Sequence, residues 1–177
     1  MTGAQPASAE EYARLHNRAL IGYLLKLGVC LDDAQDAAGE TLRRMFENWD
    51  AIVQPKAWAR KTAYNIVVDM VRARNSEGDK GARVQAQFVL VSSGTEDLWM
   101  LKEEQRAVIG RIRKLPAAQR AVIALHLDGF TDGEIAEIMG SGAATVRSNL
   151  RHAKARLRME LEAEGVYRHA TGTDGGE

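Results

Sequence analysis

The sequence has little of several residue types that define other protein classes. It contains one cysteine, Cys30, among 177 residues, so no disulfide can form within the chain and a reducing compartment is expected. Three prolines and sixteen glycines exclude a collagen-like or other fibrous protein. Aromatic residues make up 6% of the chain and hydrophobic residues 45%, which indicates a globular protein with a mainly aliphatic core.

Long apolar runs and signal features are also lacking. No apolar stretch approaches the roughly 20 residues that a membrane-spanning helix requires. The N-terminal residues MTGAQPASAEE have neither the basic head nor the apolar run of a secretion signal. We therefore expect a cytoplasmic protein without a membrane partner.

Residues that usually carry catalysis are scattered along the chain. The histidines have no metal-ligand spacing among themselves or with Cys30; they are His16, His126, His152 and His169. No glycine-rich loop with a phosphate-binding pattern precedes a predicted helix. The sequence therefore predicts no enzymatic activity, no metal site and no cofactor.

Apolar residues at helical spacing predict an all-α fold in two blocks. The first block, residues 8–74, is expected to hold three helices, over about 9–27, 32–49 and 55–74. Ser8 and Glu11 form a predicted capping box for the first of them. The third helix is expected to turn one stripe towards the core, made of Ala59, Thr62, Ile66 and Met70.

Residues 75–95 interrupt the helical pattern because glycine, serine and charged residues are frequent there. We expect a flexible linker, although its apolar run Phe88–Val91 is predicted to rest on a partner or a neighbouring helix. So long a linker argues for two small domains. The second block is residues 96–163, with a first helix from about Glu96 to Lys114, and residues 164–177 are expected to be a disordered tail.

The second block contains a helix-turn-helix pattern. Thr131 and Glu134 form a predicted capping box for a short helix, Gly140-Ser141-Gly142 makes the turn, and a longer helix follows. In this motif the second helix enters the DNA major groove, and its first residues meet the base edges. The residues expected at that position are Thr145, Arg147, Ser148 and Asn149.

Basic residues mark one face of the last predicted helix. Arg147, Arg151, Lys154 and Arg158 are spaced by four, three and four residues, which aligns them on one side. Such a row can neutralise phosphates, while Arg147 or Asn149 can read purine edges. Acidic residues follow this helix, which explains how a DNA-binding chain can have a formal net charge of zero.

The segment LPAAQRAVIALHLDGFTDGEIAEIMGSGAATVRSNLRHAKARLR resembles region 4 of the sigma-70 transcription initiation factors, which reads the −35 promoter element. The resemblance lies in Leu115-Pro116, Gln119-Arg120, Glu134-Ile135-Ala136, Thr145-Val146 and the basic helix. Response regulators carry a similar module. The first block distinguishes the two, since DDAQDAAGETLRRMFENWD and PKAWARKTAYNIVVDMVRAR resemble region 2 of the small extracytoplasmic-function (ECF) sigma factors.

The resemblance implies a sigma factor that binds core RNA polymerase and promoter DNA, with an anti-sigma protein as a further partner. Region 2 would span residues 8–74 and region 4 residues 96–163. The implied polymerase-binding residues are Asp33, Asp36, Glu40, Thr41, Arg44 and Met45. Those implied for recognition and melting of the single-stranded −10 element are Asn48, Trp49, Asp50, Trp58, Arg60, Lys61, Tyr64, Asn65, Asp69 and Arg72. Those implied for the duplex −35 element are Arg120, Thr145, Val146, Arg147, Ser148, Asn149, Arg151 and Lys154.

Helical spacing agrees with part of this assignment. Lys61, Tyr64, Asn65, Val68 and Arg72 are expected on one helix face, away from the core stripe, where cations track a single strand and Tyr64 stacks on a base. Trp49 and Trp58 also fit a second interpretation as core aromatics, which we favour for Trp49.

The sequence departs from the family at two places. Ala37-Ala38-Gly39 replaces larger apolar residues and a Gln, and Ser141-Gly142 replaces an apolar residue and a Ser cap. Two alternatives therefore stay open. One is a one-component helix-turn-helix regulator that dimerises on palindromic DNA. The other is a degenerate sigma-like protein that titrates a regulator.

Overall fold

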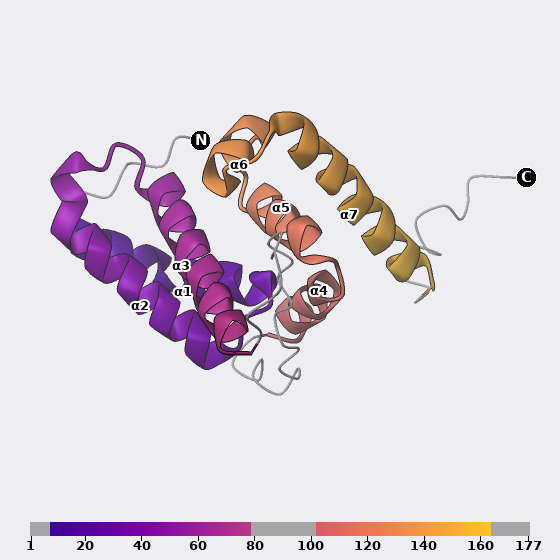
Figure 1. Cartoon of the computed structure of the whole chain (residues 1–177), viewed down its shortest axis with the longest axis horizontal. Helices are drawn as coiled ribbons and strands as arrows, with labels where there is room; N and C mark the ends of the chain where they lie inside the picture. Colours follow the sequence, from indigo (N-terminus) through magenta and orange to yellow (C-terminus); the bar gives the residue numbers. More distant parts are fainter. Residues whose placement is uncertain (1–7, 79–101, 164–177) are drawn as a thin grey trace, which may run out of the picture.

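The computed structural model describes residues 8–78 and 102–163, with the backbone alone at residues 75–78. Within these ranges the regular structure is entirely helical, which confirms the predicted all-α class (Figure 1). The elements are α1 (Ala9–Leu27), α2 (Leu31–Asn48), a 3-10 turn η1 (Trp49–Ala51), α3 (Pro55–Gly78), α4 (Glu103–Arg113), α5 (Ala117–Leu127), α6 (Asp132–Met139) and α7 (Ala143–Ala163). The predictions for Phe88–Val91 and for the tail 164–177 lie outside the described residues.

Short polar residues and glycines set the helix ends as the sequence predicts. The Ser8 hydroxyl accepts a hydrogen bond from the Glu11 backbone N–H at 3.2 Å, and α1 ends at Gly28, whose φ is 97°. Thr131 and Glu134 form the reciprocal capping box of α6. Gly140 ends α6 with φ 61°, a conformation that glycine adopts without steric cost.

Two predicted boundaries are wrong. Helix α3 continues to Gly78, beyond the expected end at Arg74, so the first residues of the predicted linker are helical. Serine and glycine cost a helix only about 1 kcal/mol or less per residue, which does not force an end there. Helix α4 begins at Glu103, after the non-helical Lys102, and not near Glu96.

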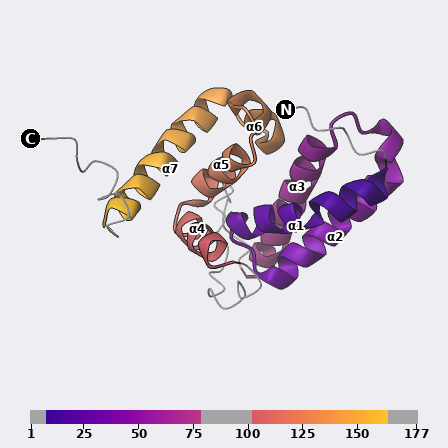
Figure 2. The same ribbon diagram turned by 180° about the vertical axis from the view of Figure 1, so that it is seen from behind.

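The two blocks pack against each other. In Figures 1 and 2, α1–α3 form one bundle and α4–α7 a second, and α1 lies between α2 and the helices α4 and α5. Helix α3 also meets α6. One continuous hydrophobic cluster runs through both bundles and includes Leu24, Val67, Ile109, Leu125 and Ile135. The two predicted domains therefore share a core, which their separation by a linker did not predict.

The core stripe of α3 differs from the predicted one. Its fully buried residues are Ala59, Ala63 and Val67, whereas Thr62, Ile66 and Met70 are only half-buried. Tyr64, expected on an exposed face, is 9% exposed and belongs to the core, and burial raises the pKa of its phenol. Tertiary packing explains this difference. Helix α3 packs on α1 and α2 and also on α6, so it is covered on more than one side.

Candidate nucleic-acid interface

The helix-turn-helix is formed by α6 and α7. Val146, Leu150 and Ala153 of α7 are buried in the core, and α7 packs against α5 and α6. The Thr131 backbone N–H and hydroxyl both donate to the Glu134 carboxylate at 2.8 Å, and these bonds lower the pKa of Glu134. These bonds cap α6, while the buried residues of α7 fix its inner face and leave its outer face exposed.

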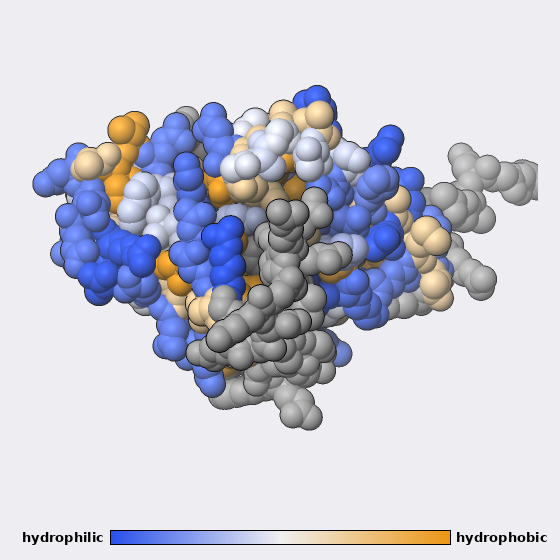
Figure 3. All heavy atoms as spheres, viewed as in Figure 1, coloured by the Kyte–Doolittle hydropathy of each residue, from blue (hydrophilic) through white to orange (hydrophobic). Residues whose placement is uncertain are grey.

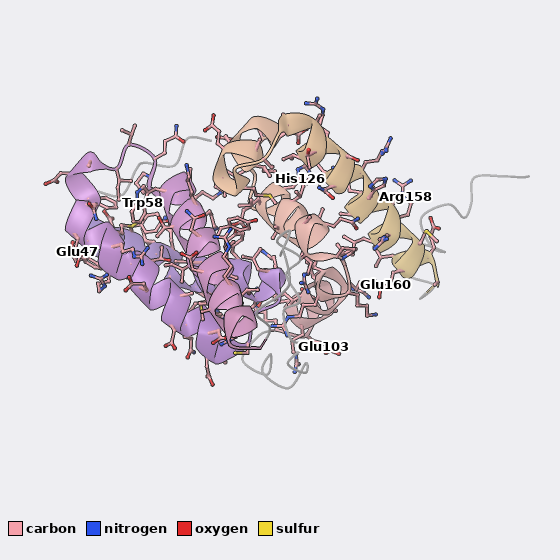
Figure 4. The ribbon with its side chains drawn as sticks, in the orientation of Figure 1. Glu47, Trp58, Glu103, His126, Arg158 and Glu160 are labelled. Atoms are coloured by element: carbon pink, nitrogen blue, oxygen red, sulfur yellow. The ribbon has the colours of Figure 1, made fainter. Side chains whose placement is uncertain are left out.

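The predicted row of cations forms one surface on α7. Arg147, Arg151, Lys154 and Arg158 together line a shallow depression of about 430 Å³, whose edge includes Asp132. All four side chains are exposed, and Arg158 projects from the side of α7 that lies away from the first bundle (Figure 4). The surface over this bundle is largely hydrophilic in Figure 3. The alignment predicted from the residue spacing is confirmed.

Asn149 does not join this cationic surface. At about 100° per residue, Asn149 lies roughly 200° around α7 from Arg147, and its side chain is half-buried. Thr145 and Ser148 are exposed near the start of the helix. Val146 is fully buried, so its place in the motif is structural packing.

Arg120, expected to contact a phosphate, is 7% exposed. One guanidinium nitrogen donates to the carbonyl oxygen of Arg113 at 3.1 Å, which links α5 to the end of α4. Burial, with a smaller effect of the Arg113 charge, lowers the pKa of Arg120. In this conformation Arg120 holds the α4–α5 turn and presents little surface to DNA.

A second polar surface lies on α3 and the turn before it. The side chains of Asn48, Asp50, Lys61, Asn65, Asp69 and Arg72 are exposed there. Val53, at the α2–α3 turn, is 82% exposed, and orange spheres in Figure 3 mark an apolar patch near this end of the molecule. Val53 was not among the predicted site residues. Its only signal in the sequence is its position next to the implied −10 residues.

The two tryptophans beside this surface are partly buried. Trp49 lies 6.3 Å from Tyr12, measured between ring centroids, and packs on the small cluster of Ala9, Tyr12, Met45 and Ala59. Trp58 packs on the same cluster and lies between α2 and α3 in Figure 4. Trp49 thus packs against the core as the favoured interpretation expects, although it is only half-buried.

Helix α2 presents a charged outer face. Arg43 and Arg44 both donate to the Glu40 carboxylate. These bonds lower the pKa of Glu40 to about 2, and the bond from Arg43 has the larger effect. Asp36 is exposed nearby, and Asp33 pairs with Arg74 of α3 at 2.7 Å. Of the implied polymerase-binding residues, Thr41 and Met45 are fully buried, and the Thr41 hydroxyl donates to the Ala37 carbonyl.

The sequence departure at Ala37-Ala38-Gly39 leaves α2 intact. Ala37 and Ala38 are each 1% exposed, and the helix is continuous from Leu31 to Asn48. Gly39 is exposed, and an added Cβ there would meet nothing within 4 Å. The small residues therefore leave the helix in place and reduce only the side-chain surface available to a partner.

Arg60, implied in −10 recognition, lies at the boundary between the bundles and is 2% exposed. Its Nε is 2.6 Å from Oδ2 of Asp128, and its guanidinium stands over the Tyr23 ring at 5.0 Å. Arg113 of α4 also crosses the boundary and donates to the carbonyl oxygens of Leu25 and Val29. The sequence carries no signal for these contacts, because long-range pairs leave no local pattern.

Within the described ranges, no helix is both long and apolar enough to cross a membrane, and no cluster of three or more His, Cys, Asp or Glu side chains could hold a metal ion. The described residues form a helix-turn-helix with a basic outer face on one bundle and an exposed polar helix surface on the other. This combination is typical of a helical DNA-binding protein.

The comparisons identify the family. The profile of Sigma-70 region 2 matches residues 12–77, and that of Sigma-70 region 4 matches residues 105–157. The RNA polymerase sigma-E factor of Streptomyces avermitilis is 33% identical over 89% of this chain and 87% of that protein. The ECF RNA polymerase sigma factor SigL of Mycobacterium tuberculosis is 28% identical over 95% of this chain and 98% of that protein. The chain belongs to the sigma-70 family, in its ECF group.

Solved structures show the same fold. The sigma factor RpoE of Bartonella quintana, in complex with the anti-sigma factor NepR, aligns with a TM-score of 0.65 at 23% identity over 86% of this chain and 96% of that chain. CnrH, in complex with the cytosolic domain of CnrY, aligns with a TM-score of 0.55 at 20% identity, covering 88% of each chain.

Proposed function

We propose that this sigma factor directs core RNA polymerase to promoters by reading a −35 element with α7 and a −10 element with α3 and the turn before it. The observation that carries the proposal is the row of Arg147, Arg151, Lys154 and Arg158 on the exposed face of the second helix of a helix-turn-helix. Cations in this position contact phosphates on both sides of the major groove.

At the −35 element, Arg147 is the residue best placed to read a base. It is the fifth residue of α7, close to the end of the helix that the motif brings to base edges, and arginine pairs bidentately with guanine. Arg151, Lys154 and Arg158 lie further along the helix and would fix its register on the phosphates. Ser148 is exposed beside them, whereas the exposed Thr145 and the half-buried Asn149, four residues apart, face the other flank.

At the −10 element, Lys61, Asn65 and Arg72 provide an exposed polar track along α3. Cations of this kind follow a single-stranded backbone, and a pocket that holds an extruded base offsets part of the unpairing cost without ATP. Asn48 and Asp50, at the end of α2 and in η1, stand beside this track. Tyr64 is buried, so the base-stacking role proposed for it requires a different conformation from the one seen here.

The outer face of α2 is the proposed contact with polymerase. Asp36, Glu40 and Arg44 present charge there, while Thr41 and Met45 support the helix from inside. An anti-sigma protein is a further proposed partner, since the sigma factor RpoE, which has the same fold, was solved in complex with the anti-sigma factor NepR. We further propose that the chain acts in the cytoplasm and has no enzymatic activity of its own.

Two measurements separate this proposal from its alternatives. We expect the purified chain to elute as a monomer, to bind core polymerase, and to bind a −35/−10 duplex specifically only in the complex with polymerase. A dimer that binds palindromic DNA unaided would instead support a one-component regulator. Absence of polymerase binding would support a degenerate interaction protein, and Asp36→Lys, compared with the exposed control Glu137→Gln, would locate the polymerase contact on α2.

A further inference from the structure

Asp128, at the C-terminal end of α5, gathers cations from the first bundle. Its carboxylate lies 2.6 Å from Arg60 Nε and 3.6 Å from Lys26 Nζ, and its backbone carbonyl accepts a hydrogen bond from Lys56 Nζ. These cations come from α1 and α3, whereas Asp128 belongs to the helix-turn-helix block. One acidic residue of the second block therefore binds three basic residues of the first.

Arg60 is buried and Asp128 is half-buried, which makes the pair sensitive to the loss of either charge. The side chains of Arg60 and Asp128 are 3% and 13% exposed. Apart from Asp128, Arg60 has a weak contact to the Ala19 carbonyl at 3.4 Å, and its Nη1 is buried without a hydrogen-bond partner. A buried guanidinium whose main partner is one carboxylate becomes strongly unfavourable once that carboxylate is neutralised. Separation of the bundles would return Arg60 to water.

This closed arrangement is incompatible with simultaneous promoter contacts. Helix α3 packs directly on α6, the first helix of the helix-turn-helix, and Lys56 lies over the Phe130 ring at 5.1 Å. Elements named for positions −35 and −10 lie about 25 base pairs apart, which is roughly 85 Å of duplex at about 3.4 Å per base pair. Helices in contact with each other do not reach both elements, so the two bundles must separate before both are bound.

We propose that Arg60 and Asp128 form an electrostatic latch that holds the free chain closed, with Lys26 and Lys56 as auxiliary contacts to the same residue, and that release of this latch precedes promoter binding. Only the second part, release of the latch before promoter binding, rests on the proposed function. The latch itself is a property of the isolated chain. In this closed state the face of α3 that packs on α6 is covered by the second block of the same chain.

The test is small-angle X-ray scattering of the full-length chain, which does not depend on transcription. A compact chain of this length has a radius of gyration of about 16 Å, and each variant is compared with wild type at the same full length. We expect Asp128→Asn to increase the radius of gyration relative to wild type, and Arg60→Gln to increase it similarly. The double variant should add little to either. The control Glu137→Gln, a neutralised exposed acid on α6, should match wild type.

Circular dichroism ensures that the scattering change reports opening and not unfolding, since the separated bundles keep their helices. Unchanged scattering for both Asp128→Asn and Arg60→Gln, with wild-type helicity, would overturn the latch. The second part is tested by the association rate with core polymerase and a promoter duplex, which should rise severalfold for Asp128→Asn. If Asp128→Asn opens but wild type and variant both fail to bind polymerase, the latch stands and the proposed function fails.

Discussion

The Arg60 guanidinium lies 2.6 Å from the Asp128 carboxylate, although 68 positions separate the two residues in the chain. Because Arg60 is buried and Asp128 is its main partner, we expect Arg60→Gln and Asp128→Asn each to lower the free energy of unfolding. The double variant should lose less than the sum of the two, with a coupling energy of about 1–3 kcal/mol. Urea unfolding of the four proteins measures this coupling. Additive losses would show that the two residues stabilise the fold independently.

Arg151 and Arg156 provide a matched test of the DNA-binding face. Both lie on α7 and both are exposed, but Arg151 lines the cationic depression and Arg156 does not. We expect Arg151→Ala to weaken binding of the polymerase complex to all promoter sequences and to reduce the slope of log affinity against log salt by about 1. Fluorescence anisotropy over a salt series measures both quantities. Equal effects of Arg151→Ala and Arg156→Ala would contradict the assigned face.

Gly39 and Gly140 should respond to alanine in opposite directions. Gly39 lies within α2 and a Cβ there meets open space, so we expect Gly39→Ala to stabilise the protein by about 0.5–1 kcal/mol. Gly140 has φ 61°, so Gly140→Ala should cost about 1 kcal/mol or more. Thermal unfolding distinguishes the two. A destabilising Gly39→Ala would mean that α2 is not regular at this position.

Much of the local structure could be predicted from the sequence because its signals are local. Ser8, Thr131 and Gly140 mark helix ends through their own hydrogen bonds or dihedral angles. The alignment of Arg147 with Arg158 follows from helical spacing alone. The basic surface on α7 was therefore predictable down to its individual residues.

The rest depended on how the bundles meet. Tyr64 and Arg60 lie on α3 at positions that spacing placed with DNA, yet both are buried, Tyr64 in the shared core and Arg60 against Asp128. Arg120 resembles a phosphate contact in its motif but donates to Arg113. A local pattern states which side of a helix is apolar. It does not state how many neighbours will cover that helix.

His16 should make stability depend on pH. Its ring lies 4.6 Å from that of Tyr12, and burial, followed by the charges of Arg60 and Lys56, lowers the pKa of His16. A lowered pKa in the folded state means that the unfolded chain binds the proton more readily. The contribution of His16 is thus present above about pH 6.5 and is lost as the pH falls through the lowered pKa.

We expect wild type to lose more stability than His16→Gln between pH 7.5 and pH 5.5 in urea unfolding. His152→Gln, which removes an exposed histidine on α7, is the control. It should lose as much stability as wild type between the two pH values. An identical loss in wild type and His16→Gln would show that His16 does not couple folding to protonation.

We propose that this chain gives core RNA polymerase its promoter specificity through α7 and α3. The most direct test is run-off transcription with core polymerase and the purified chain on a genomic promoter library, with Arg147→Ala in parallel. We predict specific transcripts whose promoters share a −35 and a −10 sequence, with Arg147→Ala relaxing discrimination at one −35 position by about 1–3 kcal/mol. No transcripts above core polymerase alone, from a chain that folds and binds polymerase, would contradict it.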